Sequence, residues 1–269
     1  MEIFSVLKFE IHRNIKSILI FAGVIGGFIL LMSSIFEPAF FAEYNDIMST
    51  ISPEVLELIG GIVDMSTFEG FFNLYIFEFA WMWYGLYIIL IVAQDIPEEL
   101  EKKTIDLVLS KPVKRWEFVV GKQLRHLMTI LTVLVFSVVF TLFAILINPN
   151  IIVAEVDIGG FIVCFVCLGV LLFAIESTVV LISTIFDRKK STAVGFALVM
   201  GLWFLSAYSG SIPVDNIEYL SFFTYFDSRS ILIDQDFTGT LGNVLILFGY
   251  SLILSLLANI YFTKRDIPV

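Results

Sequence analysis

Residues 127–147 read LMTILTVLVFSVVFTLFAILI, an apolar run without a single charged side chain. A helix of about 20 apolar residues is long enough to cross the hydrocarbon core of a bilayer. Lipid cannot hydrogen-bond the backbone of an open strand, so a continuous run of this length must be helical. A transmembrane β-barrel would instead show short segments of alternating polarity. The stretch therefore predicts a transmembrane helix.

Five more apolar runs lie before and after this one, each bounded by charged or turn residues. They cover residues 17–36, 72–94, 158–186, 192–208 and 241–263. Hydrophobic residues make up 58% of the chain and charged residues 16%, whereas soluble domains carry about 45–50% and about 25%. The sequence predicts an all-α polytopic membrane protein with six transmembrane helices, which forms one domain over residues 1–269. A soluble globular protein is excluded.

Lysine and arginine are distributed unequally between the segments that connect these runs. The cytoplasmic side of a membrane protein carries the excess of these residues. If the chain crosses the membrane six times, every lysine and arginine except Arg229 falls on one side of the membrane, together with both termini. The segment between the second and third runs contains Lys102, Lys103, Lys111, Lys114, Arg115, Lys122 and Arg125. We therefore expect both termini to be cytoplasmic in a cell membrane. The net charge of −10 is then a property of the outer surface and indicates no nucleic-acid partner.

Two cytoplasmic segments have helical patterns of their own. Residues 1–16 place Ile3, Phe4, Leu7 and Ile11 on one helical face, which predicts an amphipathic helix lying in the membrane interface. The alternative is that the first span simply starts early.

The second segment, residues 95–125, begins with Asp95, Pro97, Glu98 and Glu99. A capping acid, an early proline and acids near the positive end of the dipole are typical of a helix N-terminus. The sequence Ser110-Lys111-Pro112 predicts a break, because the residue before proline avoids helical geometry. A second helix is expected over residues 114–125.

No catalytic or metal-binding motif is found in the chain. It lacks the G-x-x-x-x-G-K-[ST] phosphate loop, so any ATP must be bound by another polypeptide. It also lacks H-E-x-x-H and G-x-S-x-G. Cys164 and Cys167 have redox-motif spacing, but they fall inside an apolar run and are interpreted as small packing residues. His12 and His126 are interpreted as polar residues at the membrane edge.

Glu78 and Glu176 are the acidic residues inside the apolar runs. An ionisable residue in a membrane is costly, and it indicates either a functional site or a buried pairing. The two acids could line a route for a substrate. Alternatively, each could be a neutral acid that is hydrogen-bonded to a neighbouring helix.

In the first run, Gly23-x-x-x-Gly27 permits close approach of a second helix.

Residues 94–122 resemble the first cytoplasmic loop of the type-2 ATP-binding-cassette permeases. That loop has an acidic start, a basic residue before a threonine, a leucine-rich turn, Ser-x-Pro and a basic residue, and then a lysine at the next span. The corresponding residues here are Glu98 and Glu99, Lys103 and Thr104, Leu107 and Leu109, Ser110 and Pro112, Arg115, and Lys122. The six-span layout, the basic turn at residues 187–191 and residues 262–266 near the C-terminus are similar too.

The resemblance implies a permease subunit of an exporter that binds no cofactor itself. Two such subunits, identical or related, would assemble in the lipid bilayer with two ATP-binding subunits that carry ATP and Mg. Residues 95–117 would form a coupling helix that docks on the ATP-binding subunit. Its interface residues would be Glu98, Glu99, Lys102, Lys103, Thr104, Leu107, Ser110, Pro112 and Arg115. The alternatives are an ATP-independent transporter or channel, and a membrane scaffold subunit that does not transport.

Overall fold

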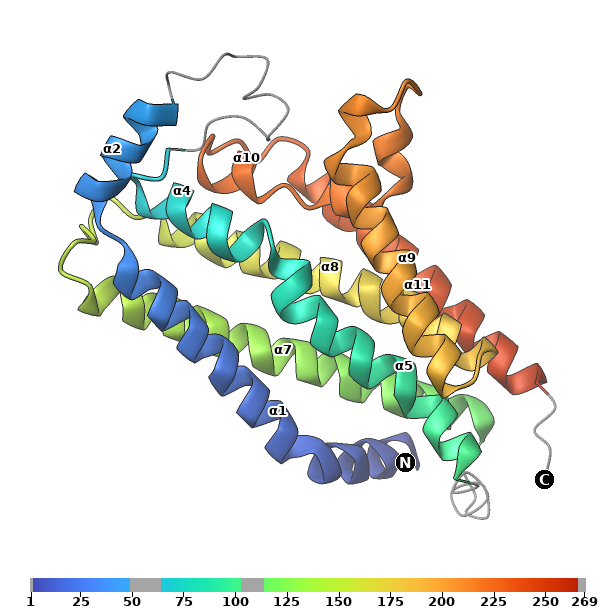
Figure 1. Cartoon of the computed structure of the whole chain (residues 1–269). Coiled ribbons are helices and arrows are strands. Elements are labelled where there is room, and N and C mark those ends of the chain that lie inside the picture. The colour runs from blue at the N-terminus through green and yellow to red at the C-terminus, as the bar shows by residue number, and fades with distance from the viewer. Residues whose placement is uncertain (1, 49–63, 103–113, 266–269) are drawn as a thin grey trace.

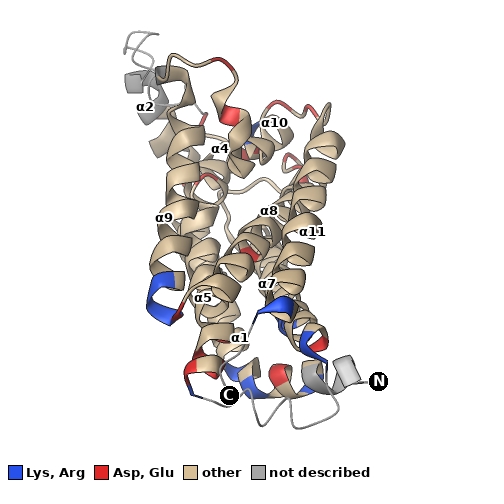
Figure 2. Cartoon of the chain, turned by 90° about the vertical axis from the view of Figure 1, so that its right-hand side faces the viewer, with Lys and Arg blue, Asp and Glu red and all other residues tan. Residues whose placement is uncertain are grey.

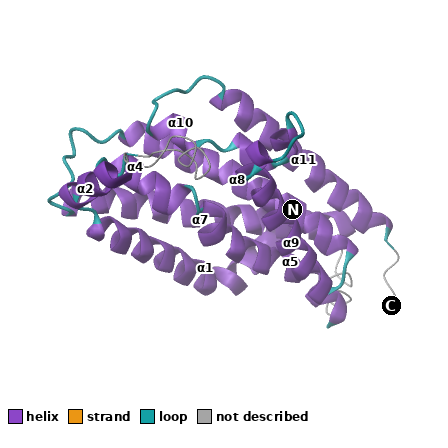
Figure 3. Ribbon diagram, turned by 45° about the horizontal axis from the view of Figure 1, so that its top comes forward, coloured by secondary structure: helices purple, strands orange, loops and turns teal. Residues whose placement is uncertain are grey.

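The computed structural model describes residues 2–48, 64–102 and 114–265. Within these ranges the chain is helical and contains no strand (Figure 3). Six segments are long and apolar enough to cross a membrane, namely Leu7–Ile35, Phe68–Glu101, Arg115–Ile147, Ile158–Ile185, Arg188–Ala207 and Thr240–Lys264. The all-α fold and the six membrane-crossing helices are therefore confirmed.

The long helices are α1 (Glu2–Ile35), α5 (Leu86–Glu101), α7 (Arg115–Ile147), α8 (Ile158–Ile185), α9 (Arg188–Ala207) and α11 (Thr240–Lys264). Short helices cover one end of the bundle: α2 (Pro38–Met48), α4 (Phe68–Phe72), α10 (Ser228–Leu232), and the 3-10 turns η3 (Ser209–Ser211), η4 (Ile217–Leu220) and η5 (Phe222–Tyr225). Helix α1 is continuous, but it changes direction, so that its first turns lie across the end of the bundle (Figure 1).

Helix α8 forms the centre of the bundle. It contacts α5, α7, α9, α10 and α11, and its side chains are apolar on nearly every face, as expected for a helix surrounded by protein. Helix α1 packs mainly along α7. Asp187 caps the start of α9, where its carboxylate accepts a hydrogen bond from the Lys190 backbone N–H at 3.0 Å. That hydrogen bond lowers the pKa of Asp187.

The second membrane segment is not a regular α-helix. Two π-helical stretches, η1 (Asn73–Phe77) and η2 (Trp81–Gly85), lie between α4 and α5. Such wide turns often occur at functional sites. Aromatic rings pack this irregular part against its neighbours. The ring centroid of Phe77 lies 5.0 Å from that of Phe165 on α8, and Trp81 lies 5.1 Å from Trp203 on α9.

Lysine and arginine gather at one end of the bundle, where both termini also lie (Figure 2). We call this the basic end. It contains the start of α7, the start of α9 and the end of α11. The unequal distribution that the sequence indicates is therefore present in three dimensions.

The contact between α1 and α7 leads to a prediction about Gly26. A Cβ atom at this position would lie 2.6–2.8 Å from the ring of Phe140, whereas a Cβ atom at Gly23 meets nothing within 4 Å. Overpacking a helix contact costs about 1–3 kcal/mol. We expect Gly26→Leu to lower the free energy of unfolding in detergent by this amount and Gly23→Leu to leave it unchanged. Equal effects of the two variants would contradict the packing of α1 on α7.

Candidate functional site

A group of charged side chains, largely buried except for that of Arg13, lies at the basic end, between α1, α5 and α7. Charged residues are rarely buried unless they are paired. The group, which we call the ion cluster, consists of Glu10 and Arg13 from α1, Asp95 and Glu99 from α5, and Lys122, Arg125 and His126 from α7. It joins three helices that are distant in the sequence.

Lys122 is at the centre of the ion cluster, with only 1% of its surface exposed. Its Nζ atom donates to Glu99 Oε1 at 2.7 Å and to Asp95 Oδ1 at 3.0 Å, and it lies 3.7 Å from Glu10 Oε1. The ammonium group also lies 5.0 Å from the ring centroid of Phe118, a distance at which cation–π attraction acts. One cation thus connects carboxylates from α1 and α5 to α7.

Two arginines complete the pairing of these carboxylates. Arg125 Nη2 donates to Asp95 Oδ2 at 2.8 Å, and Arg125 Nε lies 3.7 Å from Glu10 Oε2. Arg13 Nη2 donates to Glu10 Oε2 at 2.9 Å and lies 3.5 Å from Glu99 Oε1. Lys122 and Arg125 belong to the basic segment between the second and third apolar runs, yet both are buried, because α7 begins at Arg115 and its first turns pack inside the bundle.

The spacing of the ion cluster follows from helix geometry. Residues four positions apart lie on one face of a helix. Asp95 and Glu99 have this spacing on α5, and Lys122 and His126 have it on α7. The two faces meet, with carboxylates on one and basic side chains on the other. This pairing of acidic and basic i, i+4 positions is the sequence signal that could have revealed the site.

His126 connects the ion cluster to Glu176, which lies in the middle of the bundle on α8. Its Nδ1 atom is 2.9 Å from Glu176 Oε1, and its Nε2 atom is 3.2 Å from Asp95 Oδ2. His126 is 1% exposed and Glu176 is fully buried. The side chain of His126 is therefore enclosed by protein rather than exposed at the membrane edge. Glu176 therefore has the surroundings of an acid that is hydrogen-bonded to a neighbouring helix, which is one of the two alternatives that the sequence left open.

The predicted coupling residues fall into four groups. Glu98 and Lys102 form an ion pair that is partly exposed, and Arg188 at the start of α9 lies 3.8 Å from Glu98. Glu99 faces inward, so its side chain is not on the exposed face that Glu98 occupies. Lys103, Thr104, Leu107, Ser110 and Pro112 lie outside the described residues. Arg115 begins α7 and donates to the Arg265 backbone carbonyl at 2.9 Å, which links α7 to the end of α11.

The prediction that a helix begins at Asp95 is wrong. Helix α5 runs without interruption from Leu86 to Glu101 and contains Pro97. Proline lacks an N–H, so the carbonyl group four residues before it loses a partner, but the helix continues. Asp95 does not cap a helix because its carboxylate is directed to Lys122 and Arg125. The second helix, predicted over residues 114–125, is present as the start of α7, where Glu117 accepts a hydrogen bond from the Lys114 N–H at 2.8 Å.

The structure does not place Glu78 in the same setting as Glu176. Glu78 lies between η1 and η2, and its side chain is exposed, whereas Glu176 is buried. Cys164 and Cys167 are buried free thiols. Within the described ranges, no group of three or more His, Cys, Asp or Glu side chains is arranged to hold a metal ion.

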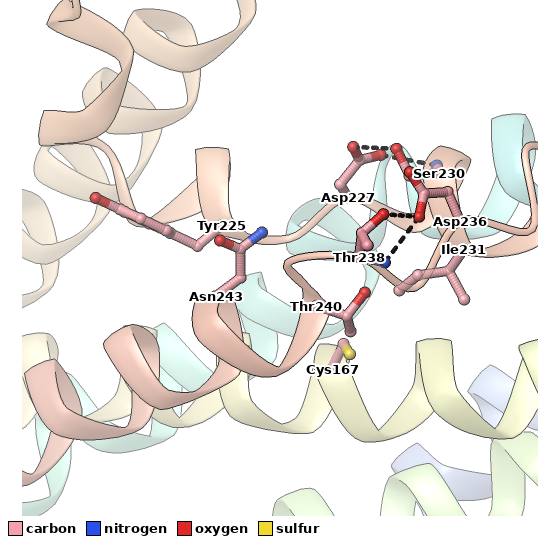
Figure 4. A pocket seen from close by; sticks show the side chains of 9 residues that line it. All are labelled: Cys167, Tyr225, Asp227, Ser230, Ile231, Asp236, Thr238, Thr240 and Asn243. Atoms are coloured by element: carbon pink, nitrogen blue, oxygen red, sulfur yellow. Dashed lines mark hydrogen bonds between the residues drawn. The ribbon is translucent and has the colours of Figure 1, made fainter.

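A small pocket lies at the end of the bundle opposite the basic end (Figure 4). Its lining includes Asp227 and Asp236, whose carboxylates are satisfied by their own loops. Asp227 accepts hydrogen bonds from the backbone N–H and the hydroxyl of Ser230, and Asp236 accepts two from Thr238. The remaining lining residues are Cys167, Tyr225, Ile231, Thr240 and Asn243. Both carboxylates of the pocket therefore already accept hydrogen bonds from within their own loops.

A family model described as ABC-2 family transporter protein matches residues 6–267. This range includes all six membrane-crossing helices and every residue of the ion cluster. No curated protein matches the chain.

Proposed function

The chain belongs to the ABC-2 transporter family, and from this premise we propose that it is the permease subunit of an ATP-driven exporter. It is a multi-pass membrane protein. A separate subunit binds and hydrolyses ATP with Mg, because this chain lacks the phosphate loop. A second copy of the chain, or a related permease, completes the transport unit. The basic end faces the cytoplasm of a cell membrane, as the positive-inside rule predicts.

The observation that carries this proposal is the attachment of the coupling segment to the membrane helices. Glu98 and Lys102 lie at least partly exposed at the end of α5, and each is within one turn of Glu99 in the ion cluster. A push on the exposed side of α5 therefore moves side chains that hold α1 and α7. Arg188, which donates to Gln94 Oε1 at 2.6 Å, adds a link to α9.

Such a connection can transmit a movement because packed helices shift between discrete arrangements rather than deforming continuously. Closure of the ATP-binding subunits would displace the end of α5, and the ion cluster would carry the displacement to α1 and α7. The residues of the segment 103–113 provide the remainder of the docking surface in this proposal.

A pull-down from native membranes tests the proposal. The tagged chain, extracted in mild detergent, should co-purify with an ATP-binding-cassette protein in roughly equal amount, as mass spectrometry would show. If the chain is recovered without such a protein, even after cross-linking, it works without ATP and the proposed function fails.

Charge reversal at Glu98 tests the docking surface itself. We expect Glu98→Lys to reduce recovery of the ATP-binding subunit by about tenfold, because a like-charge contact across an interface costs more than about 1.4 kcal/mol. The matched control is Glu155→Lys, an exposed glutamate in the loop at the opposite end of the bundle. Equal recovery with both variants would remove Glu98 from the interface.

A further inference from the structure

The contacts of His126 require more protons than a neutral imidazole and two carboxylates contain. Asp95 accepts hydrogen bonds from Lys122 and Arg125, so it is an ionised acceptor. Its 3.2 Å contact with His126 Nε2 therefore needs a proton on that nitrogen. The 2.9 Å contact between Nδ1 and Glu176 Oε1 needs a second proton, either on the ring or on the carboxyl group.

We infer that Glu176 and His126 form a buried proton-binding site that holds one extra proton and is connected to the basic end through Asp95. The extra proton is located on Glu176 Oε1, which then donates to a neutral ring, or on Nδ1, which makes the ring an imidazolium ion. In both forms, each of the two short contacts is a hydrogen bond. This inference goes beyond the proposed function and does not depend on it.

The surroundings of Glu176 agree with a shared proton. Among the described residues, no lysine or arginine lies within ion-pair distance of Glu176, and His126 is its recorded hydrogen-bond partner. The second oxygen, Oε2, is buried without a partner. A bare carboxylate in this position would be costly, whereas a neutral acid, or a carboxylate beside an imidazolium ion, costs less.

The neighbouring helices contribute few other ionisable groups that could act on this pair. Helix α7 contributes Arg125, and α5 contributes Asp95, which binds His126 rather than Glu176. Helix α11 contributes Tyr250, whose hydroxyl lies 3.0 Å from that of Thr178. The basic residues of α9 are in its first turn, and Arg229 of α10 lies at the opposite end of the bundle. From α1, Glu10 lies beside Arg125.

The geometry also defines a route for the proton. Glu176 Oε1–H transfers its proton to His126 Nδ1, and His126 Nε2–H transfers a proton to Asp95 Oδ2. One proton leaves Glu176 and one arrives at Asp95, while the ring changes from the Nε2–H to the Nδ1–H tautomer. No electron is transferred. Asp95, whose side chain is 10% exposed, then releases the proton to water at the basic end.

The chain is well suited to a direct test because it contains only two histidines. His12 is exposed on α1, so His12→Gln leaves His126 as the sole histidine signal in the full-length protein. Nitrogen-15 NMR of this protein, labelled at histidine and purified in detergent at neutral pH, identifies which ring nitrogens carry protons. We expect a proton on Nε2, with or without one on Nδ1. A neutral ring protonated on Nδ1 alone would overturn the inference.

A titration of the same sample adds a second test. With Glu176 present, the first proton neutralises a pair of charge −1, whereas in Glu176→Gln the proton creates a charge of +1. We expect the midpoint of the His126 signal to fall by about 1–3 pH units in Glu176→Gln, since a neighbouring opposite charge has an effect of this size. Glu78→Gln removes the other intramembrane acid and should leave the midpoint unchanged. A midpoint that is equal in Glu176→Gln and its Glu176-containing parent would contradict the site.

If Glu176→Gln does not fold, the ring-protonation measurement on the Glu176-containing protein still decides the question. Neither experiment uses an ATP-binding partner. A failure of the proton site is therefore distinct from a failure of the proposed transport function.

Discussion

Replacing Lys122 with methionine is expected to lower the free energy of unfolding by about 3–5 kcal/mol, which is the cost of removing one partner from a buried ion pair. Lys122 is buried, and its ammonium group contacts Glu99, Asp95 and Glu10. Methionine keeps most of the side-chain volume but leaves these carboxylates without their central cation. Thermal or denaturant unfolding of the purified chain in detergent measures the loss.

The matched control for this experiment is Lys102→Met. Lys102 forms an ion pair with Glu98, but its side chain is 62% exposed. Exposed ion pairs contribute roughly 0–1 kcal/mol. The control variant should therefore have nearly the same free energy of unfolding as the unaltered chain. The double variant Lys122→Met with Glu99→Gln also removes one of the carboxylates that contact Lys122, and it should recover part of the stability. Equal stability of Lys122→Met and Lys102→Met would mean that Lys122 is hydrated rather than buried.

Reversing the charge of Glu99 should abolish the folded protein, whereas the same change at the neighbouring Glu98 should not. A lysine at position 99 would place a third cation beside Lys122 and Arg13, which lie 2.7 and 3.5 Å from the present carboxylate. Burying an unpaired charge among like charges costs more than about 3 kcal/mol, which is a large part of the stability of most domains. Size-exclusion chromatography in detergent would show loss of the monodisperse species.

Glu98→Lys is the internal comparison because it changes the adjacent residue by the same charge. Glu98 lies at the surface, with 33% of its side chain exposed, so we expect a normal folded yield and a defect confined to binding of the ATP-binding subunit. Combining Glu99→Lys with Lys122→Glu restores one opposite-charge pair and should recover some folded protein. A folded, monodisperse Glu99→Lys protein would contradict the structural role of Glu99 in the ion cluster.

The predictions for Glu98 and Glu99 concern two neighbouring residues in one turn of α5. The sequence motif around Glu98 and Glu99 suggests two equivalent interface residues. The structure separates them, because neighbouring positions on a helix point about 100° apart. Glu98 is directed to Lys102 and Arg188, and Glu99 to Lys122. A substitution at each position therefore tests a different property, binding in the first case and folding in the second.

The sequence by itself determined the features that depend on local composition. Apolar runs such as residues 127–147 predict membrane-crossing helices because only a helix satisfies its own backbone in lipid. Six such helices are present. The unequal distribution of lysine and arginine places both termini at the basic end, as Figure 2 shows. The family also follows from local residues, because the motif in residues 94–122 led to the same family that the match over residues 6–267 shows.

Only the tertiary structure decided which charged residues meet. His126 is 50 residues from Glu176 and 31 from Asp95 in the sequence, yet it contacts both. Pro97 lies inside a helix rather than at its start, and Asp95 pairs with Arg125 of α7 instead of capping a helix. Such contacts depend on the rotation of each helix about its axis and on the packing of side chains between helices. Apolar periodicity does not encode these two quantities when a helix such as α8 is apolar on nearly every face.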